Sequence, residues 1–160
     1  MNISYLLIGG NEGDRAAYLQ QAAEQIAGSA CRILQTSSLY ETAAWGKTDE
    51  APFLNQALEI GTALEARPLM QVLLDIEQKL GRVRREKYGS RLIDIDILFF
   101  NDAIIEEPHL VIPHPRLQNR RFALAPMDEI APDFIHPVLR RSIADLLAIC
   151  PDPLEVKQFF

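Results

Sequence analysis

The chain has 160 residues, 48% of them hydrophobic, which is enough for one domain that buries roughly 70% of the surface exposed by its unfolded form. Its 16 Lys and Arg residues stand against 22 Asp and Glu residues and give a net charge of -6. This balance argues against broad binding to nucleic acid or to an anionic membrane. We therefore expect a single domain over residues 1–160, with neither a nucleic acid nor a membrane as its partner.

The cysteines and the N-terminal segment indicate the compartment. Cys31 and Cys150 lack the close spacing of a zinc or redox motif and are typical of reduced thiols in the cytosol. The first apolar run, residues 3–8, is far shorter than a signal-peptide core or a membrane span. We expect a cytoplasmic protein whose N-terminus is not processed.

The first 42 residues predict a strand, a helix and a second strand. Residues 3–8 are continuously apolar, as in a buried strand, and the sequence Gly-Gly-Asn at residues 9–11 predicts a turn after them. Asp14 can cap a helix in which apolar residues recur every three or four positions until Gly28 stops it. Residues 32–42, rich in Ile, Thr, Ser, Leu and Tyr, predict the second strand.

The middle of the chain repeats this pattern. A polar stretch at residues 46–52 precedes a predicted strand over residues 53–64. Pro68 then favours the start of a helix with one apolar face, and Gly81 ends it. Residues 82–91 hold five Arg or Lys residues without any apolar period, and we interpret them as a mobile loop.

The C-terminal part begins with residues 92–100, the most apolar predicted strand. His-Pro turns, a helical stretch over residues 120–127 and a short helix over residues 142–149 follow. The order of these elements matches an α+β fold, the ferredoxin-like α/β sandwich. In that fold a mostly antiparallel sheet has helices packed on one face.

Two acidic residues in the last strong strand are the first candidates for chemistry. Strand alternation places Asp94 and Asp96 on one face, roughly 6.5 to 7 Å apart, and Ile93, Ile95 and Ile97 on the other. Two carboxylates this close in an apolar strand repel each other unless a cation lies between them, and Mg²⁺ fits their oxygen ligands best. The alternative interpretation is a strand with one solvated face.

A basic segment directly precedes the acidic pair. Residues 82–91 place arginines and a lysine beside the predicted metal-binding strand. Phosphate transfer requires little covalent chemistry from a protein. It requires positioning and neutralisation of phosphate charge, which arginines and Mg²⁺ supply. We therefore predict a small magnesium-dependent enzyme that transfers phosphate from a nucleoside triphosphate; without the acidic pair, a solvated surface run would be the better interpretation.

The twelve residues from Lys87 to Leu98, KYGSRLIDIDIL, resemble the signature of the 6-hydroxymethyl-7,8-dihydropterin pyrophosphokinase family. Similarity to that family continues in order along nearly the whole chain. It includes residues 5–11, 37–42, 53–55, 81–84, 113–114 and 119–122.

The resemblance implies a monomeric ferredoxin-like enzyme of folate biosynthesis. Such an enzyme moves the β,γ-diphosphate of ATP onto the hydroxymethyl group of 6-hydroxymethyl-7,8-dihydropterin and releases AMP, with two Mg²⁺ ions per active site. Asp94 and Asp96 would bind both ions. Arg82, Arg84 and Arg91 match catalytic residues of a loop that closes over the triphosphate, where Arg84 and Arg91 would stabilise its charge during transfer.

The resemblance also implies two sets of binding residues. The positions that match ATP-binding residues are Glu77, Arg84, Arg91, Ile97, His114 and Arg120. The positions that match the pterin slot, which would hold a flat ring between aromatic faces, are Thr42, Ala43, Trp45, Phe53, Asn55, Asp94 and Phe122.

Some positions depart from the family pattern. Ala43-Ala44 replaces a frequent pair of prolines, so the loop that faces the pterin is expected to be less rigid. Leu74, Tyr88 and Pro115 replace a Gln, a Trp and a Tyr, which affects individual ATP contacts. Residues 9–13 are glycine-rich but lack the Lys and the Ser or Thr of a P-loop, and we expect them to permit loop movement near the pterin.

Two other functions are compatible with parts of this pattern. One is a noncatalytic small-molecule-binding regulatory module, because ferredoxin-like domains often serve that role. It would bind its ligand without releasing AMP. The other is a metal-dependent nucleic-acid enzyme that uses the same Asp pair. The net charge and the lack of an extended basic stripe argue against it.

Overall fold

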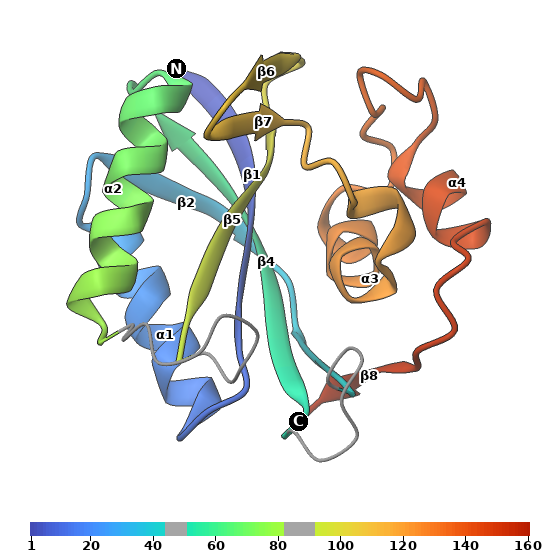
Figure 1. Cartoon of the computed structure of the whole chain (residues 1–160), viewed down its shortest axis with the longest axis horizontal. Helices are drawn as coiled ribbons and strands as arrows, with labels where there is room; N and C mark the ends of the chain where they lie inside the picture. The colour runs from blue at the N-terminus through green and yellow to red at the C-terminus, as the bar shows by residue number, and fades with distance from the viewer. Residues whose placement is uncertain (44–50, 82–91) are drawn as a thin grey trace.

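The computed structural model describes residues 1–43, 51–81 and 92–160 (Figure 1). Within them, six strands form one antiparallel sheet in the order β5-β1-β4-β3-β8, and β2 also pairs with β4. The strands of this sheet are β1 (Asn2–Gly10), β2 (Cys31–Thr36), β3 (Leu39–Thr42), β4 (Phe53–Thr62), β5 (Asp94–Phe100) and β8 (Val156–Phe159).

Helices cover both faces of this sheet (Figure 1). One face carries α1 (Arg15–Ala27) and α2 (Ala66–Lys79), and the other carries α3 (Arg121–Ile130) and α4 (Ile143–Ala148). The predicted α+β class is confirmed, but the prediction of helices on one face only was wrong. The central strand β1 is buried at every residue from Ser4 to Gly10, so apolar side chains on both of its faces need a cover.

The register of β1 divides the core into two parts. Leu6 and Ile8 point to the α1 and α2 side, where they join the larger apolar cluster. Tyr5 and Leu7 point to the α3 and α4 side. There, Tyr5 pairs across the sheet with Phe99, and the ring of Phe134 lies 5.1 Å and 4.6 Å from these two rings, between centroids. This aromatic packing fills the sheet face near the start of β1.

The predicted strand over residues 32–42 is two strands, separated at Ser37 and Ser38. Ser37 occupies the break: its backbone N–H donates to the carbonyl oxygen of Ala57, and its hydroxyl accepts from the Ala57 N–H, both at 2.9 Å. Ser38 and the Tyr40 hydroxyl donate to the carboxylate of Glu129. These contacts, which involve a distant helix, interrupt the strand, and β2 and β3 lie end to end along one edge of β4.

Three short strands were not predicted. β6 (Ile105–Glu107) and β7 (Leu110–Ile112) form a separate hairpin, and β8 extends the main sheet beside β3. A single 3-10 turn, η1 (Leu117–Asn119), precedes α3. Runs of three or four residues are too short for an alternating pattern to indicate a strand.

The predicted helix ends are largely confirmed. The Asp14 side chain caps α1 by accepting from the Ala17 N–H, Gly28 follows α1, and Gly81 follows α2 with a φ of 90°. Ser142 caps α4 in the same way. None of the helices in the described ranges is long and apolar enough to cross a membrane.

Candidate active site

The acidic pair lies where the sequence predicts it. Asp94 and Asp96 alternate along β5 with Ile95 and Ile97, which are buried in the α1 and α2 core. The two carboxylates therefore point to the α3 face of the sheet, beyond the end that the aromatic rings fill. On the neighbouring strand β1, Asp94 pairs with Gly9 and Asp96 with Leu7.

Gly9 joins the acidic pair to a polar residue on the next strand. It pairs with Asp94 on one side and with Asn55 of β4 on the other. A Cβ atom at Gly9 would lie 2.1 Å from Asn55 Oδ1, so the side chain of Asn55 occupies the space that any larger residue would need. The prediction of a turn at residues 9–11 was wrong for Gly9 and Gly10, which lie inside β1.

These residues form the floor of a cavity of about 200 Å³, which we call the aromatic cavity. Its floor is the α3 face of β1, β4 and β5, and its far wall comes from α3 and the segment before β8. The residues that line it are Leu7, Gly9, Thr42, Ala43, Phe53, Asn55, Asp94, Asp96, Arg120, Phe122 and Leu154. Every described residue that the sequence assigned to the pterin slot belongs to it.

The polar residues of the aromatic cavity are held by the fold. Thr42 is buried, and its hydroxyl donates to the carbonyl oxygen of Glu155 at 3.0 Å, which ties the end of β3 to the start of β8. Asn55 is buried beside Gly9. An ordered hydroxyl and an amide at the edge of an apolar slot suit a flat ligand with polar edges.

Arg120 and Phe122 form one wall together. The Arg120 guanidinium lies over the Phe122 ring, with its carbon 5.5 Å from the ring centroid, a cation–π contact. Burial and the charge of Arg116 lower the pKa of Arg120, whereas Asp96 and Asp152 oppose that shift. Arg120, which the sequence assigned to ATP, thus lines the aromatic cavity rather than the second one.

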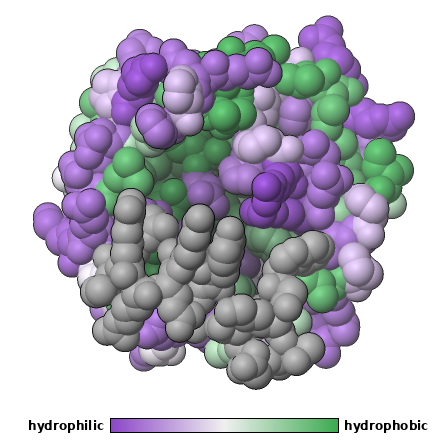
Figure 2. Space-filling view, in the orientation of Figure 1, coloured by the Kyte–Doolittle hydropathy of each residue, from purple (hydrophilic) through white to green (hydrophobic). Residues whose placement is uncertain are grey.

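A second cavity of about 240 Å³ lies on the other side of the acidic pair. It is bounded by α2, β5 and the β6–β7 hairpin, and Figure 2 shows apolar surface in the recess between α2 and this hairpin. Its lining residues are Met70, Leu73, Leu74, Glu77, Asp94, Ile95, Asp96, Ile97, His109, Leu110, Val111 and His114. Glu77, Ile97 and His114, three of the predicted ATP-binding residues, meet here.

The hydrogen bonds of Glu77 and His114 fix how these two residues are held in the second cavity. Glu77 is only 3% exposed, and its carboxylate accepts a hydrogen bond from the Ile95 N–H at 2.6 Å, so that it anchors α2 to β5. Burial, followed by the charges of Arg120 and Arg116, lowers the pKa of His114 to about 4. Its Nδ1 atom accepts from the Arg116 N–H. The neutral ring therefore carries its proton on Nε2 and can donate one hydrogen bond.

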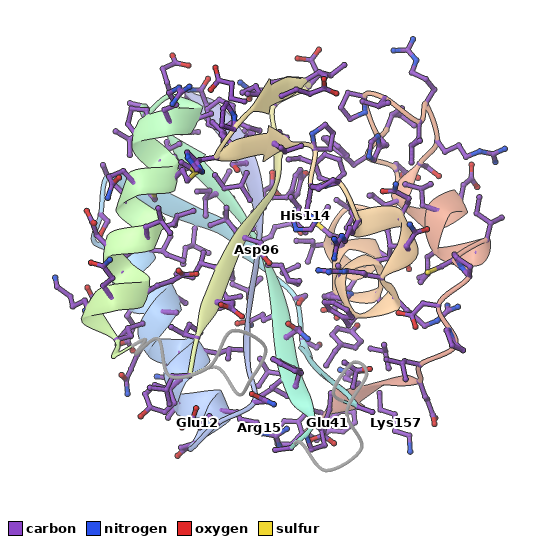
Figure 3. All side chains as sticks on the ribbon, viewed as in Figure 1. Glu12, Arg15, Glu41, Asp96, His114 and Lys157 are labelled. Atoms are coloured by element: carbon purple, nitrogen blue, oxygen red, sulfur yellow. The ribbon has the colours of Figure 1, made fainter. Side chains whose placement is uncertain are left out.

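Asp94 and Asp96 line both cavities, so the acidic pair forms the boundary between them. Figure 3 labels Asp96 on β5 and His114 after the hairpin. Among the described residues, no group of three or more His, Cys, Asp and Glu side chains is placed to hold a metal ion. Two half-buried carboxylates on one strand face nevertheless fit Mg²⁺, which commonly takes one or two carboxylates and completes its shell with water and phosphate oxygens.

Several predicted residues lie outside the described ranges. Trp45 of the predicted pterin slot and the predicted catalytic arginines Arg82, Arg84 and Arg91 are among them, as is Tyr88. Their roles remain predictions.

The structure also adds residues that the sequence analysis missed. Leu154 is one, because a single apolar residue near the C-terminus carries no signal that it faces a cavity. His109, Leu110 and Val111 are others, brought to the second cavity by the unpredicted hairpin. Gly9, which the sequence analysis placed near the pterin in a segment that permits loop movement, instead lies inside β1, where a glycine indicates a close approach of another group.

An α+β domain in which one acidic pair lies between an aromatic cavity and a second cavity of similar size can hold two ligands next to the same carboxylates. Comparison with known proteins identifies the family. Residues 5–132 match the model of the 7,8-dihydro-6-hydroxymethylpterin-pyrophosphokinase (HPPK) family, and the chain belongs to this family.

Individual relatives agree with the family match. The chain is 43% identical over 136 residues to 2-amino-4-hydroxy-6-hydroxymethyldihydropteridine pyrophosphokinase of Methylorubrum extorquens, covering 84% of this chain and 86% of the relative. It is 45% identical over 130 residues to the Bacillus subtilis protein of the same name, covering 81% and 78%.

Solved structures support the fold. A crystal structure of Plasmodium falciparum HPPK-DHPS superposes with a TM-score of 0.74 at 19% sequence identity and covers 92% of this chain. The chain spans only 43% of that longer protein. The superposition confirms the ferredoxin-like architecture predicted from the order of elements.

Proposed function

We propose that this protein transfers the β,γ-diphosphate of ATP to the hydroxymethyl group of 6-hydroxymethyl-7,8-dihydropterin, a step of folate biosynthesis. The family match and the names of the relatives support this activity. The structural observation that carries the proposal is the position of Asp94 and Asp96, which line both cavities. A ligand in each cavity would reach the acidic pair from opposite sides.

The aromatic cavity suits the pterin. Phe53 and Phe122 come from the sheet and from α3, respectively, and line the same space, so a flat ring between them would bury both of its faces. Thr42 and Asn55 lie where the polar edge of the ring would need partners. The hydroxymethyl group would then point toward Asp94 and Asp96.

The second cavity suits ATP. Met70, Leu73 and Ile97 provide apolar surface for the base. The neutral ring of His114 provides an Nε2–H donor for a phosphate oxygen. Glu77 belongs to the same proposed nucleotide site, where its hydrogen bond from the Ile95 N–H holds α2 against β5.

The remaining charge on the triphosphate requires cations. Arg82, Arg84 and Arg91 stay part of the proposal on the strength of the sequence resemblance, and Arg120 adds a guanidinium beside Asp96. Asp94 and Asp96 would hold two Mg²⁺ ions. When bound, the ions would neutralise phosphate charge and make the pterin hydroxyl easier to deprotonate.

The chemical step is a single displacement at phosphorus. The pterin hydroxyl oxygen forms a bond to the β-phosphorus of ATP, the bond between that phosphorus and the oxygen bridging to the α-phosphate breaks, and AMP leaves. The hydroxyl proton passes to solvent. The two cavities hold the reactants on opposite sides of the acidic pair, and much of the rate enhancement would come from this positioning.

The enzyme would work as a cytoplasmic monomer. Each cavity draws its lining residues from several elements of the same chain, an arrangement compatible with a monomer. Sedimentation velocity at micromolar concentration would test the monomeric state.

The activity is tested by measuring AMP and pterin diphosphate with ATP, Mg²⁺ and 6-hydroxymethyl-7,8-dihydropterin. We expect the two products in equal amounts, and neither after the pterin is omitted or Mg²⁺ is chelated. Binding of the pterin without AMP release would instead support the noncatalytic regulatory module.

A further inference from the structure

A buried carboxylate lies behind one wall of the aromatic cavity without lining it. Asp152 is 4% exposed and belongs to the segment between α4 and β8. Its Oδ2 atom accepts a hydrogen bond from the Arg121 N–H at 3.0 Å, and its Oδ1 atom accepts one from the Leu154 N–H at 2.9 Å. Burying a carboxylate is costly, and these two bonds offset part of that cost.

The first bond replaces a missing helix cap. Arg121 is the first residue of α3, and its N–H is one of the four at a helix start that have no partner within the helix. The residue in the N-cap position, Arg120, makes no side-chain cap bond. Asp152 therefore caps α3 from 31 residues away, and its negative charge suits the positive end of the helix dipole.

The second bond shapes the segment that follows. Asp152 stands between Pro151 and Pro153. Because Pro153 has no N–H, Leu154 offers the first backbone donor after Asp152, and the side chain closes a tight Asx-type turn onto it. This turn fixes the direction in which the chain enters the aromatic cavity at Leu154.

Arg121 joins the same two segments in the opposite direction. Its guanidinium Nη2 donates to the carbonyl oxygens of Cys150 and Asp152, at 3.1 Å and 3.2 Å. The start of α3 is thus linked to residues 150–154 by the Arg121 N–H, which donates to the Asp152 carboxylate, and by the Arg121 guanidinium. They should move as one unit.

This unit carries one wall of the aromatic cavity. Arg120 and Phe122 flank Arg121, and both line the cavity, as does Leu154. Asp152 also opposes the lowering of the Arg120 pKa by burial and by Arg116, so its carboxylate acts electrostatically on this wall as well. In contrast, the carboxylate of Asp152 accepts hydrogen bonds from Arg121 and Leu154, neither of which lines the second cavity.

We propose that Asp152 is a positioning residue for the aromatic cavity: its buried carboxylate joins the start of α3 to the Leu154 segment and so holds Phe122 and Leu154 opposite the sheet. The proposal rests on the proposed function only for the identity of the flat ligand. It predicts that Asp152 controls pterin affinity and affects the affinity for ATP much less, through Arg120 alone.

The experiment compares Asp152→Asn and Asp152→Ala with Ser142→Ala in the full chain. Ser142→Ala is the matched control, because it removes the cap of α4 on the same sheet face and its hydroxyl contacts neither cavity. We expect the Kd of 6-hydroxymethyl-7,8-dihydropterin to rise about 10-fold in Asp152→Ala and about three-fold in Asp152→Asn, as hydrogen bonds to a charged acceptor are lost. The Kd of a nonhydrolysable ATP analogue should stay within about two-fold.

Amide hydrogen exchange provides a readout that needs no ligand. Exchange should accelerate at residues 121–123 and at Leu154 in both Asp152 variants, with β1 and β5 unchanged. If wild-type protein makes no AMP but exchange responds in this way, the proposed function fails and the positioning role stands. If folded Asp152→Asn showed unchanged exchange and unchanged pterin affinity, the positioning role would be overturned. The same would follow if the Asp152 variants lost pterin and ATP affinity equally, and by no more than Ser142→Ala does at the same loss of stability.

Discussion

The two faces of the main sheet are built differently. On the α1 and α2 face, apolar side chains such as Leu6, Leu54 and Ile95 pack without interruption against the helices. On the α3 and α4 face, the rings around Phe99 fill one end of the sheet. The other end carries polar residues such as Asp94 and a residue without a side chain, Gly9. The first face supplies stability. The second face leaves the aromatic cavity open, and the proposed chemistry lies there.

The largest effect should come from removing one carboxylate of the pair. We expect Asp96→Ala to reduce AMP release by about 1,000-fold or more, because the metal and phosphate charge at this site are worth several kcal/mol in the transition state. The free energy of unfolding should change by less than about 1 kcal/mol, because Asp96 is half-buried and lies outside the apolar clusters.

The control is Asp102→Ala, which removes an exposed acidic residue just beyond the other end of β5. It should leave AMP release unchanged. Activity retained in Asp96→Ala would refute the role of the acidic pair.

Neighbouring residues on β4 test the comparison directly. Leu54 is fully buried on the α1 and α2 face, whereas Phe53 is half-buried and lines the aromatic cavity. We expect Leu54→Ala to lower the free energy of unfolding by about 2 to 5 kcal/mol with unchanged pterin affinity of the folded protein. Phe53→Ala should weaken pterin binding about 10- to 100-fold with a smaller loss of stability.

Urea unfolding and calorimetric titration of both variants measure these two effects. If both substitutions changed stability and pterin affinity in the same proportion, the division of labour between the two faces would be wrong.

A methyl group on the cavity floor should have an intermediate effect. In Gly9→Ala the new Cβ would lie 2.1 Å from Asn55 Oδ1 and 3.1 Å from the Leu54 carbonyl oxygen, so the Asn55 side chain must move. We expect pterin affinity to fall about 10-fold, with the loss of one or two hydrogen bonds. Gly28→Ala is the matched control, since its Cβ would meet its nearest neighbours at 3.6 Å and 3.7 Å. Equal pterin affinity in both variants would contradict the close approach.

The smallest expected effect concerns two histidines, His114 of the second cavity and His136 beside Phe99. Burial lowers the pKa of both: His114 falls to about 4 from 6.5, and His136, whose ring packs against Phe99, also falls below 6.5. The folded protein therefore holds neutral rings that the unfolded chain protonates first. Their contribution to stability is complete above pH 6.5 and is lost as the pH falls from 6.5 through the folded pKa values.

We expect the free energy of unfolding to be about 1 to 2 kcal/mol lower at about pH 5 than at about pH 7.5, an effect reduced by the partial exposure of His114. Urea titrations at both pH values measure it. The pH dependence should weaken in His114→Gln and persist in His109→Gln, which removes an exposed ring. A protein that is equally stable at both pH values would contradict the burial of neutral rings.

Local patterns were sufficient for much of the fold. The apolar run of β1, the Asp14 cap and the alternation around Asp94 and Asp96 are signals within a few residues, and the structure confirms them. The break at Ser37 could not be predicted in this way, because it depends on Ala57 and Glu129, which are distant in sequence.

The same distinction applies to the site. Five described members of the predicted pterin slot besides Asp94 meet in one cavity, yet Leu154 joins them only because the C-terminal segment folds back behind α3. The assignment of Arg120 to the ATP site came from resemblance alone, and the residue lines the aromatic cavity.

By itself, the sequence determined the family, the class of fold and the acidic pair, because strand alternation and a contiguous signature are local properties of the chain. Only the tertiary structure decided that the pair separates two cavities, that helices cover both sheet faces, and that Asp152 caps α3. Those features depend on contacts between residues far apart in the chain, such as Arg121 with Asp152 and Gly9 with Asn55, which no local pattern encodes.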